Sequence, residues 1–258
     1  MSITANDKKT KIIEIIGPPG AGKTTIYKAL CKEWNSGCNW IYQEKLLAKN
    51  QHSIYSPARW MESKLKSLLN KHNGQTIAVE YGIRFTETNR KTANYLWNYL
   101  DKNVDTEDGS AGQKFRAAYF LFKDYSRYQA IWEKNSAMPC IIDEGLLEKS
   151  FFVTNSNDKM KEIMDAYLEI VPLPTTLIYI DIDEPGKIVE RLLTRPKTIA
   201  SHTGKNREEL IRNIENWQKL FNIITGKLLE KNIPVYRLDG MLPINQNVQK
   251  LKQILSRF

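Results

Sequence analysis

The residues best suited to chemistry lie near the amino end, in the run Gly17-Pro18-Pro19-Gly20-Ala21-Gly22-Lys23-Thr24-Thr25. This run fits the phosphate-binding pattern G-x-x-x-x-G-K-[ST], and it follows an apolar stretch and precedes a helix-like one, as that pattern requires. The glycines let the backbone curl close to a phosphate, and the start of the next helix adds partial positive charge. We therefore expect Lys23 to contact the β- and γ-phosphates of a nucleotide and the Thr24 hydroxyl to bind Mg²⁺.

A second candidate is the acidic pair Asp143 and Glu144, which follows the short apolar run 140–142. An aspartate at the end of such a strand helps to hold Mg²⁺ beside a phosphate-binding loop, and Glu144 is then placed to accept a proton from an attacking group. The alternative is a helix N-cap followed by a first-turn acid, which also favours Asp-Glu. The preceding strand-like run favours the functional interpretation.

Basic residues form a third group. Lys187, Arg191 and Arg195 are spaced four residues apart, so on a helix they share one stripe. Arginines can neutralise the charge that spreads over a phosphoryl group during transfer. We expect Arg191 and Arg195 to be catalytic and residues 195–206 to form a closing lid, although a solvated helix face would have the same pattern.

Residues that could bind an acceptor occur at the second strand and in the insertion that follows it. Glu44 is a candidate base for an acceptor hydroxyl. Cationic and aromatic side chains that suit a planar or sugar acceptor with negative charge are Arg84, Arg116, Phe120, Lys123 and Arg127. For any one of these residues, plain packing with a solvated edge is the favoured explanation.

Strand-like and helix-like stretches alternate along the chain, which predicts an α/β fold with a parallel sheet and helices on both faces. The expected strands are 12–16, 40–42, 140–142, 175–182 and 233–238, with 76–81 ambiguous. The expected helices are 26–34, 57–70, 86–100, 113–134, 157–170, one capped by Asp183, 207–231 and 244–258. We expect one domain over residues 1–258, with residues 45–135 as a helical insertion that caps the acceptor.

Composition narrows the classes of partner. The 258 residues carry 38 basic and 29 acidic side chains, a net charge of +9, which suits nucleotide phosphates and leaves nucleic acid as a less favoured partner. Three cysteines without zinc spacing favour a reducing cytoplasm. No apolar run approaches ~18 residues, so no membrane span is expected. A homodimer is one assembly state that the sequence leaves open.

Together these parts resemble the P-loop NTPases, and within them the nucleoside and nucleotide kinases, especially the thymidylate and deoxynucleoside kinases. The resemblance rests on the loop, on Asp143, and on the stretch Tyr179-Ile180-Asp181-Ile182-Asp183-Glu184-Pro185 with Arg191 and Arg195 after it. It implies a five-stranded parallel sheet, ATP with Mg²⁺ as donor, a small acceptor under a helical cap and lid arginines. One departure is that those kinases commonly carry an arginine where this chain has Glu144.

These observations predict an ATP- and Mg²⁺-dependent phosphotransferase whose small-molecule acceptor is nucleoside-, nucleotide- or sugar-like. One alternative is an ATP-hydrolysing switch controlled by a protein partner, since an apolar strand ending in Asp-Glu also positions water in ATPases. The other alternative is a protein that binds polynucleotides or phosphorylates their ends, which the net charge would suit.

Overall fold

The structure is a computed structural model that describes residues 9–48, 77–103, 111–149, 152–153, 159–195 and 204–258. Its centre is a five-stranded parallel sheet in the order β2-β3-β1-β4-β5. The strands are β1 (Ile12–Ile16), β2 (Ile41–Tyr42), β3 (Cys140–Asp143), β4 (Thr176–Asp181) and β5 (Val235–Asp239). The predicted fold class and the five-stranded parallel sheet are confirmed.

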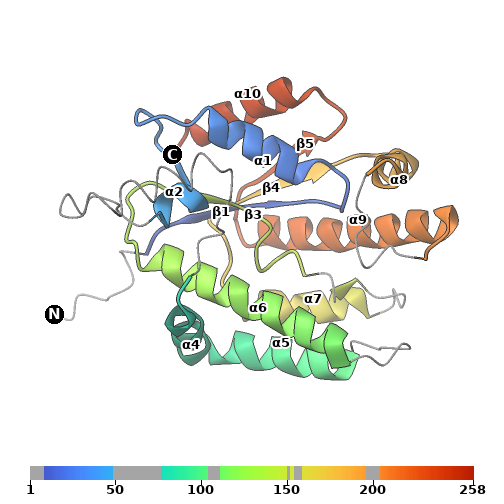
Figure 1. The fold of residues 1–258 in the computed structure, drawn as a ribbon, viewed down its shortest axis with the longest axis horizontal. Coiled ribbons are helices and arrows are strands. Elements are labelled where there is room, and N and C mark those ends of the chain that lie inside the picture. The colour runs from blue at the N-terminus through green and yellow to red at the C-terminus, as the bar shows by residue number, and fades with distance from the viewer. Residues whose placement is uncertain (1–8, 49–76, 104–110, 150–151, 154–158, 196–203) are drawn as a thin grey trace, which may run out of the picture.

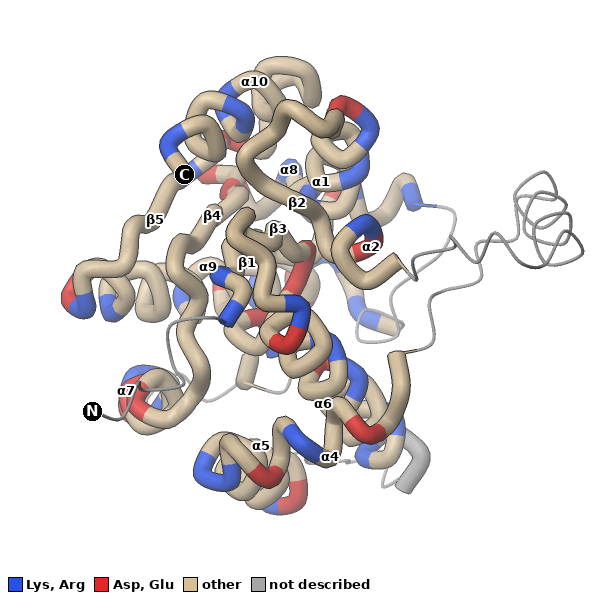
Figure 2. Tube along the Cα trace, turned by 90° about the vertical axis from the view of Figure 1, so that its left-hand side faces the viewer, with Lys and Arg blue, Asp and Glu red and all other residues tan. Residues whose placement is uncertain are grey.

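Helices cover both faces of the sheet (Figure 1). The described helices are α1 (Lys23–Lys32), α2 (Gln43–Leu46), α4 (Val79–Thr88), α5 (Arg90–Asn103), α6 (Ala111–Trp132), α7 (Met160–Leu168), α8 (Pro185–Leu193), α9 (Arg207–Glu230) and α10 (Ile244–Leu255). Helices α1 and α10 lie on one side of the strands, and α4, α5, α6 and α7 lie on the other, as the end-on view of Figure 2 also shows.

Side chains of the central strand alternate between two buried cores. Ile13 and Ile15 pack with α1, α8 and α10, whereas Ile12 and Ile16 face the core built with α4, α5, α6 and α7. All five residues of β1 are buried, which explains its nearly continuous apolar character. The one charged member, Glu14, therefore lies inside the molecule and needs partners there.

The insertion differs from the sequence prediction in two places. Val79 to Tyr81 begin helix α4 and are not a strand, and Ala78 before them is the extended N-cap residue of that helix. The single helix expected over 86–100 is two helices, because Asn89 leaves helical geometry and bonds Phe85 through its backbone and side-chain nitrogens. The helix expected over 57–70 lies outside the described residues.

Two predicted helix starts are also corrected. Helix α1 begins at Lys23 rather than at residue 26, since Gly22 already occupies its N-cap position. Glu184, not Asp183, is the N-cap residue of α8; it makes no side-chain cap bond, and Pro185 at the first helical position supplies the helical φ. Among the described helices, none has the length and apolar character needed to cross a membrane.

We predict that Phe85→Ala lowers the free energy of unfolding by about 3–5 kcal/mol. The Phe85 ring is fully buried and stacks on Tyr125 and Trp132 with centroid distances of 4.5 and 5.7 Å, so its removal leaves a cavity between α4 and α6. Denaturant titration provides the measurement. The control is Ile83→Ala on the exposed side of α4, expected to change stability by less than about 0.5 kcal/mol; equal losses in both variants would contradict the assignment.

Candidate active site

The loop between β1 and α1 has the backbone geometry that a phosphate cradle needs. Gly20 and Gly22 both have φ near +100°, a region that L side chains rarely adopt, and a Cβ at Gly17 would lie 2.2 Å from the Ile180 carbonyl oxygen. The first-turn amides of α1 have no intrahelical acceptors, so they are available to an anion. Glycine is thus required at positions 20 and 22 by the backbone conformation and at position 17 by the close approach of Ile180.

Lys23, the loop lysine, is held inside the loop and is only 5% exposed. Its ammonium donates to the Gly17 carbonyl oxygen at 2.6 Å and lies 2.8 Å from Glu148 Oε1 and 3.7 Å from Glu144 Oε1. Burial alone would lower the pKa of Lys23, but the carboxylates of Glu148 and Glu144 outweigh it and raise the pKa. Lys23 therefore stays charged despite its burial, because Glu148 and Glu144 lie beside its ammonium.

Thr24 and Asp143 meet across the loop in the arrangement expected of a magnesium site. The Thr24 hydroxyl is close enough to the Asp143 carboxyl to lower its pKa, and Asp143 Oδ1 is buried with no hydrogen-bond partner. Burial raises the pKa of Asp143. Within the described part of the chain no three His, Cys, Asp or Glu side chains cluster as a metal site. Mg²⁺ at phosphates needs only one or two protein oxygens, so this pair fits it.

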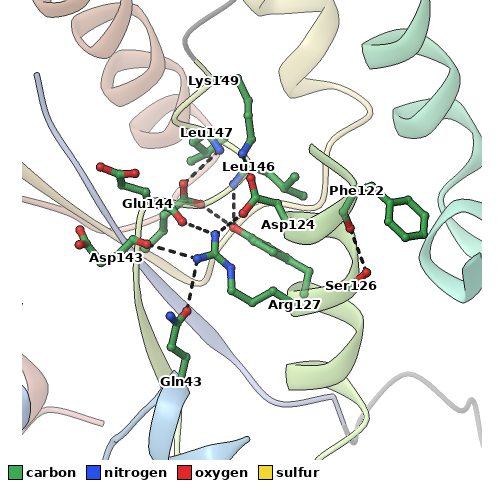
Figure 3. Close-up of polar contacts among 12 residues, drawn as sticks. Gln43, Phe122, Asp124, Ser126, Arg127, Asp143, Glu144, Leu146, Leu147 and Lys149 are labelled. Carbon is green, nitrogen blue, oxygen red and sulfur yellow. Dashed lines mark hydrogen bonds and ion pairs between the residues drawn. The ribbon is translucent and has the colours of Figure 1, made fainter. Parts of the chain in front are cut away.

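The turn after β3 carries the remaining acids of the site. Residues 144–149 contain no helix and only Leu146 and Leu147 form a turn, so Asp143 and Glu144 do not begin a helix there, and the N-cap interpretation of this pair does not hold. Glu144 has φ 58°, a left-handed conformation that is uncommon outside glycine. Arg127 on α6 donates to the carbonyl oxygen of Glu144, reaches that of Asp143 at 3.4 Å and so braces the turn (Figure 3).

A buried carboxylate in β1, that of Glu14, also holds the turn after β3 in place. Glu14 Oε2 accepts from the Tyr128 hydroxyl at 2.7 Å, and Oε1 accepts from the Leu147 amide at 3.0 Å. Burial raises the pKa of Glu14 from its ordinary 4.5 to about 7, although these bonds and the nearby Lys149 lower it. A Cβ at Gly145 would lie 2.4 Å from both Glu14 and Tyr128, so the turn can approach this close only with glycine.

One of the predicted acceptor residues on α6 reaches this centre. Arg127 contacts Gln43 of α2 at 3.4 Å in addition to the β3 carbonyls, and it pairs with Asp124, which also pairs with Lys149 (Figure 3). Glu44, beside Gln43, accepts from the Tyr27 hydroxyl at 2.7 Å. A polar wall thus lies next to the loop. It is formed by Gln43 and Glu44 of α2, by Arg127 and by the end of β3.

The other predicted acceptor residues lie farther out. Lys123, Phe120 and Arg116 continue along the face of α6 that carries Arg127, are exposed, and contact one another through cation–π pairs of 5.7–5.9 Å. Arg84 is bound to Glu133 at 2.7 Å beside Trp132, whose ring lies under Lys9 at the amino end of β1. Arg84 is therefore not brought to the loop.

The predicted lid arginines have different surroundings. Arg191 donates to the Gly240 carbonyl at 3.0 Å, and a Cβ on Gly240 would meet the Ala21 carbonyl oxygen of the loop at 2.6 Å. Arg191 thus fixes the turn after β5 against the loop. Arg195 is exposed at the end of α8. Most of the predicted lid, residues 196–203, lies outside the described residues.

Comparison with known proteins adds little to this geometry. No protein-family model matches the chain, and no curated protein matches it significantly. Among solved structures, a deoxyadenosine kinase from M. mycoides with products dCMP and dCDP matches at 14% identity and TM-score 0.49, over 95% of this chain and 98% of that one. The same kinase with bound dATP matches at 16% identity and TM-score 0.49, over 95% and 99%.

The sequence analysis missed several residues of the site, among them Glu14 and Glu148. Glu14 stands out only as the one charge in an apolar strand, which signals a buried carboxylate but not its partners. Glu148 follows two apolar residues in a segment without periodicity, and only the fold shows that it returns to Lys23.

We predict that Glu14→Gln changes how stability depends on pH. The folded state holds the Glu14 proton up to about pH 7 and the unfolded chain only to about 4.5, so stability from this group is present below 4.5 and lost as pH rises through 7. Relative to the variant, the wild type should lose about 3 kcal/mol between pH 4 and pH 8. Urea titrations of both proteins at each pH measure this, and a constant difference would contradict it.

Proposed function

We propose that this protein is an ATP- and Mg²⁺-dependent phosphotransferase that acts on a small nucleoside- or sugar-like acceptor. The observation that carries the proposal is the convergence of Lys23, the Thr24–Asp143 pair and the Glu144 turn at the start of α1. The polar wall of Gln43, Glu44 and Arg127 beside this centre supports a separate acceptor subsite, which a pure ATP-hydrolysing switch does not require.

Each side chain has a role in the proposed transfer. The loop amides and Lys23 bind the triphosphate, and Thr24 with Asp143 would hold Mg²⁺, which neutralises phosphate charge when bound. An acceptor hydroxyl attacks the γ-phosphorus, the bond from that phosphorus to the β-bridging oxygen breaks, and ADP leaves. The acceptor proton passes to a carboxylate, for which Glu44 and Glu144 are the candidates. Arg195 would approach the transferred group when the 195–206 segment closes.

A thermal-shift screen of nucleosides, nucleotides and sugars, run with Mg²⁺ and a non-hydrolysable ATP analogue, identifies the acceptor. Hits are then assayed for ADP release and for a phosphorylated product. Slow ATP turnover that one metabolite strongly accelerates supports the kinase. Turnover that is indifferent to metabolites but responds to a protein partner would instead support the switch. Retention on DNA or RNA with a steep salt dependence would support the polynucleotide alternative.

We predict that Lys23→Ala abolishes ATP turnover while the protein remains folded. The substitution removes the one ammonium inside the phosphate loop, and calorimetry should show loss of nucleotide binding together with a retained cooperative melt. Lys28→Ala, on the exposed side of the same helix, is the matched control and should keep full activity. Full turnover in Lys23→Ala would refute both enzymatic interpretations.

We also predict that Arg195→Ala slows transfer far more than it weakens ATP binding. An arginine that contacts the transferred group only during transfer contributes roughly a thousandfold or more to kcat. Kinetics and calorimetry on one preparation separate the two effects. Lys187→Ala is the control on the same helix, where Lys187 pairs with Glu184 at 2.6 Å. Equal losses of kcat and ATP affinity in Arg195→Ala would count against a lid role.

A further inference from the structure

The loop lysine already has an anionic partner before any phosphate arrives. Glu148 Oε1 lies 2.8 Å from the Lys23 ammonium, and both side chains are nearly inaccessible, at 6% and 5% exposure. Glu148 is outside the phosphate-binding motif and has no part in the proposed transfer. Its contact with Lys23 joins the turn after β3 to the first turn of α1.

A bound triphosphate competes for the same ammonium. When Lys23 contacts phosphate oxygens, its bond to Glu148 is stretched or broken, and the Glu148 carboxylate is left buried close to added negative charge. An unpaired buried charge is strongly unfavourable. Glu148 Oε2 has no hydrogen-bond partner, so no other described group compensates for the loss of Lys23.

The contact with Glu148 also holds the Lys23 ammonium where it can exchange Glu148 for a phosphate oxygen as its partner. The ammonium is held at the inner side of the loop, at 2.6 Å from the Gly17 carbonyl oxygen and 3.3 Å from that of Pro18, rather than extended into solvent. A lysine fixed in this way loses less side-chain freedom when a nucleotide binds. Glu148 thus keeps Lys23 in position. It also makes binding of the Lys23 ammonium to phosphate less favourable, because that ammonium must first leave Glu148.

We propose that Glu148 is a positioning residue of the nucleotide site, which holds the Lys23 ammonium inside the loop until a triphosphate displaces it and thereby weakens nucleotide binding. This inference rests on the proposed binding of a triphosphate at residues 17–25. It assigns to Glu148 a role in affinity and release, separate from the chemistry of transfer.

The test is isothermal calorimetry of Mg·ATP with wild type and Glu148→Gln. The amide keeps the size of the side chain but removes its charge, so the free state loses its ion pair and the bound state loses a repulsion. Both effects strengthen binding and together outweigh the lost fixing of Lys23, so we expect the Kd of the variant to fall by about tenfold or more. The KM for ATP should fall with it, whereas kcat should not rise, because Glu148 does not contact the transferred group.

Glu169→Gln is the matched control, since Glu169 also pairs with a lysine, Lys231 at 2.6 Å, but is 70% exposed at the C-cap of α7. Its ATP affinity should equal that of wild type. Glu148→Asp, which retains the charge but withdraws it from Lys23, should bind ATP more tightly than wild type and less tightly than Glu148→Gln. Unchanged or weaker ATP binding in a folded Glu148→Gln protein would overturn the inference.

A crystal structure of wild type with the ATP analogue tests the same point without any substitution. The expected result is Lys23 Nζ within hydrogen-bond distance of phosphate oxygens and out of reach of Glu148. Simultaneous contact with both would overturn the inference. Absence of any ATP binding by wild type would instead remove the proposed function, so the two failures are distinguishable.

Discussion

The arrangement of the residues around Lys23 depends on a carboxylate buried in the central strand. Glu14 binds the Tyr128 hydroxyl on α6 and the Leu147 amide in the turn after β3, and Tyr128 in turn accepts from the Leu146 amide. This small network sets the path of the turn, and the turn carries Glu144 and Glu148 to Lys23. A helix of the insertion therefore controls the electrostatics of a loop that is distant from it in sequence.

Charge in this centre is unbalanced before a ligand arrives. Three acidic side chains, those of Asp143, Glu144 and Glu148, lie near the ammonium of Lys23, and burial raises the pKa of Asp143 and Glu148. A triphosphate alone would add to the negative excess. A divalent cation that arrives with the nucleotide relieves it, because a metal ion is the largest local charge in such a site. In the proposed function, these acids would therefore favour a metal-bound nucleotide over a free one.

Much of this architecture was predictable because it follows from local rules. Strand β1, the glycine loop and α8 have strong apolar or turn patterns, and the structure places all three where these patterns predict. The division of 86–100 at Asn89 was not predictable, because it depends on a side-chain bond to Phe85 that competes with helical propensity.

The site was predictable only where a motif defines it. Lys23, Thr24 and Asp143 follow from spacing and are brought together. Glu148 and Tyr128 come from a turn and a helix face whose partners are distant in sequence, so no local pattern identifies them. The Arg84 hypothesis identified a suitable side chain, but Glu133 binds it away from the loop, and charge alone could not reveal that.

Helix α9 begins with a capping box, in which the side chains of Asn206 and Glu209 each accept from the other's backbone amide. Farther along, the helix contributes side chains to both cores. Its first half, with Leu210 and Ile214, packs on the side of α1 and α10, and its second half, with Phe221 and Ile224, packs on the other. One rigid element thus belongs to both sides of the sheet. Neither side can open by itself without exposing part of this helix, so we expect amide hydrogen exchange in its middle turns to require cooperative unfolding of both sides of the sheet.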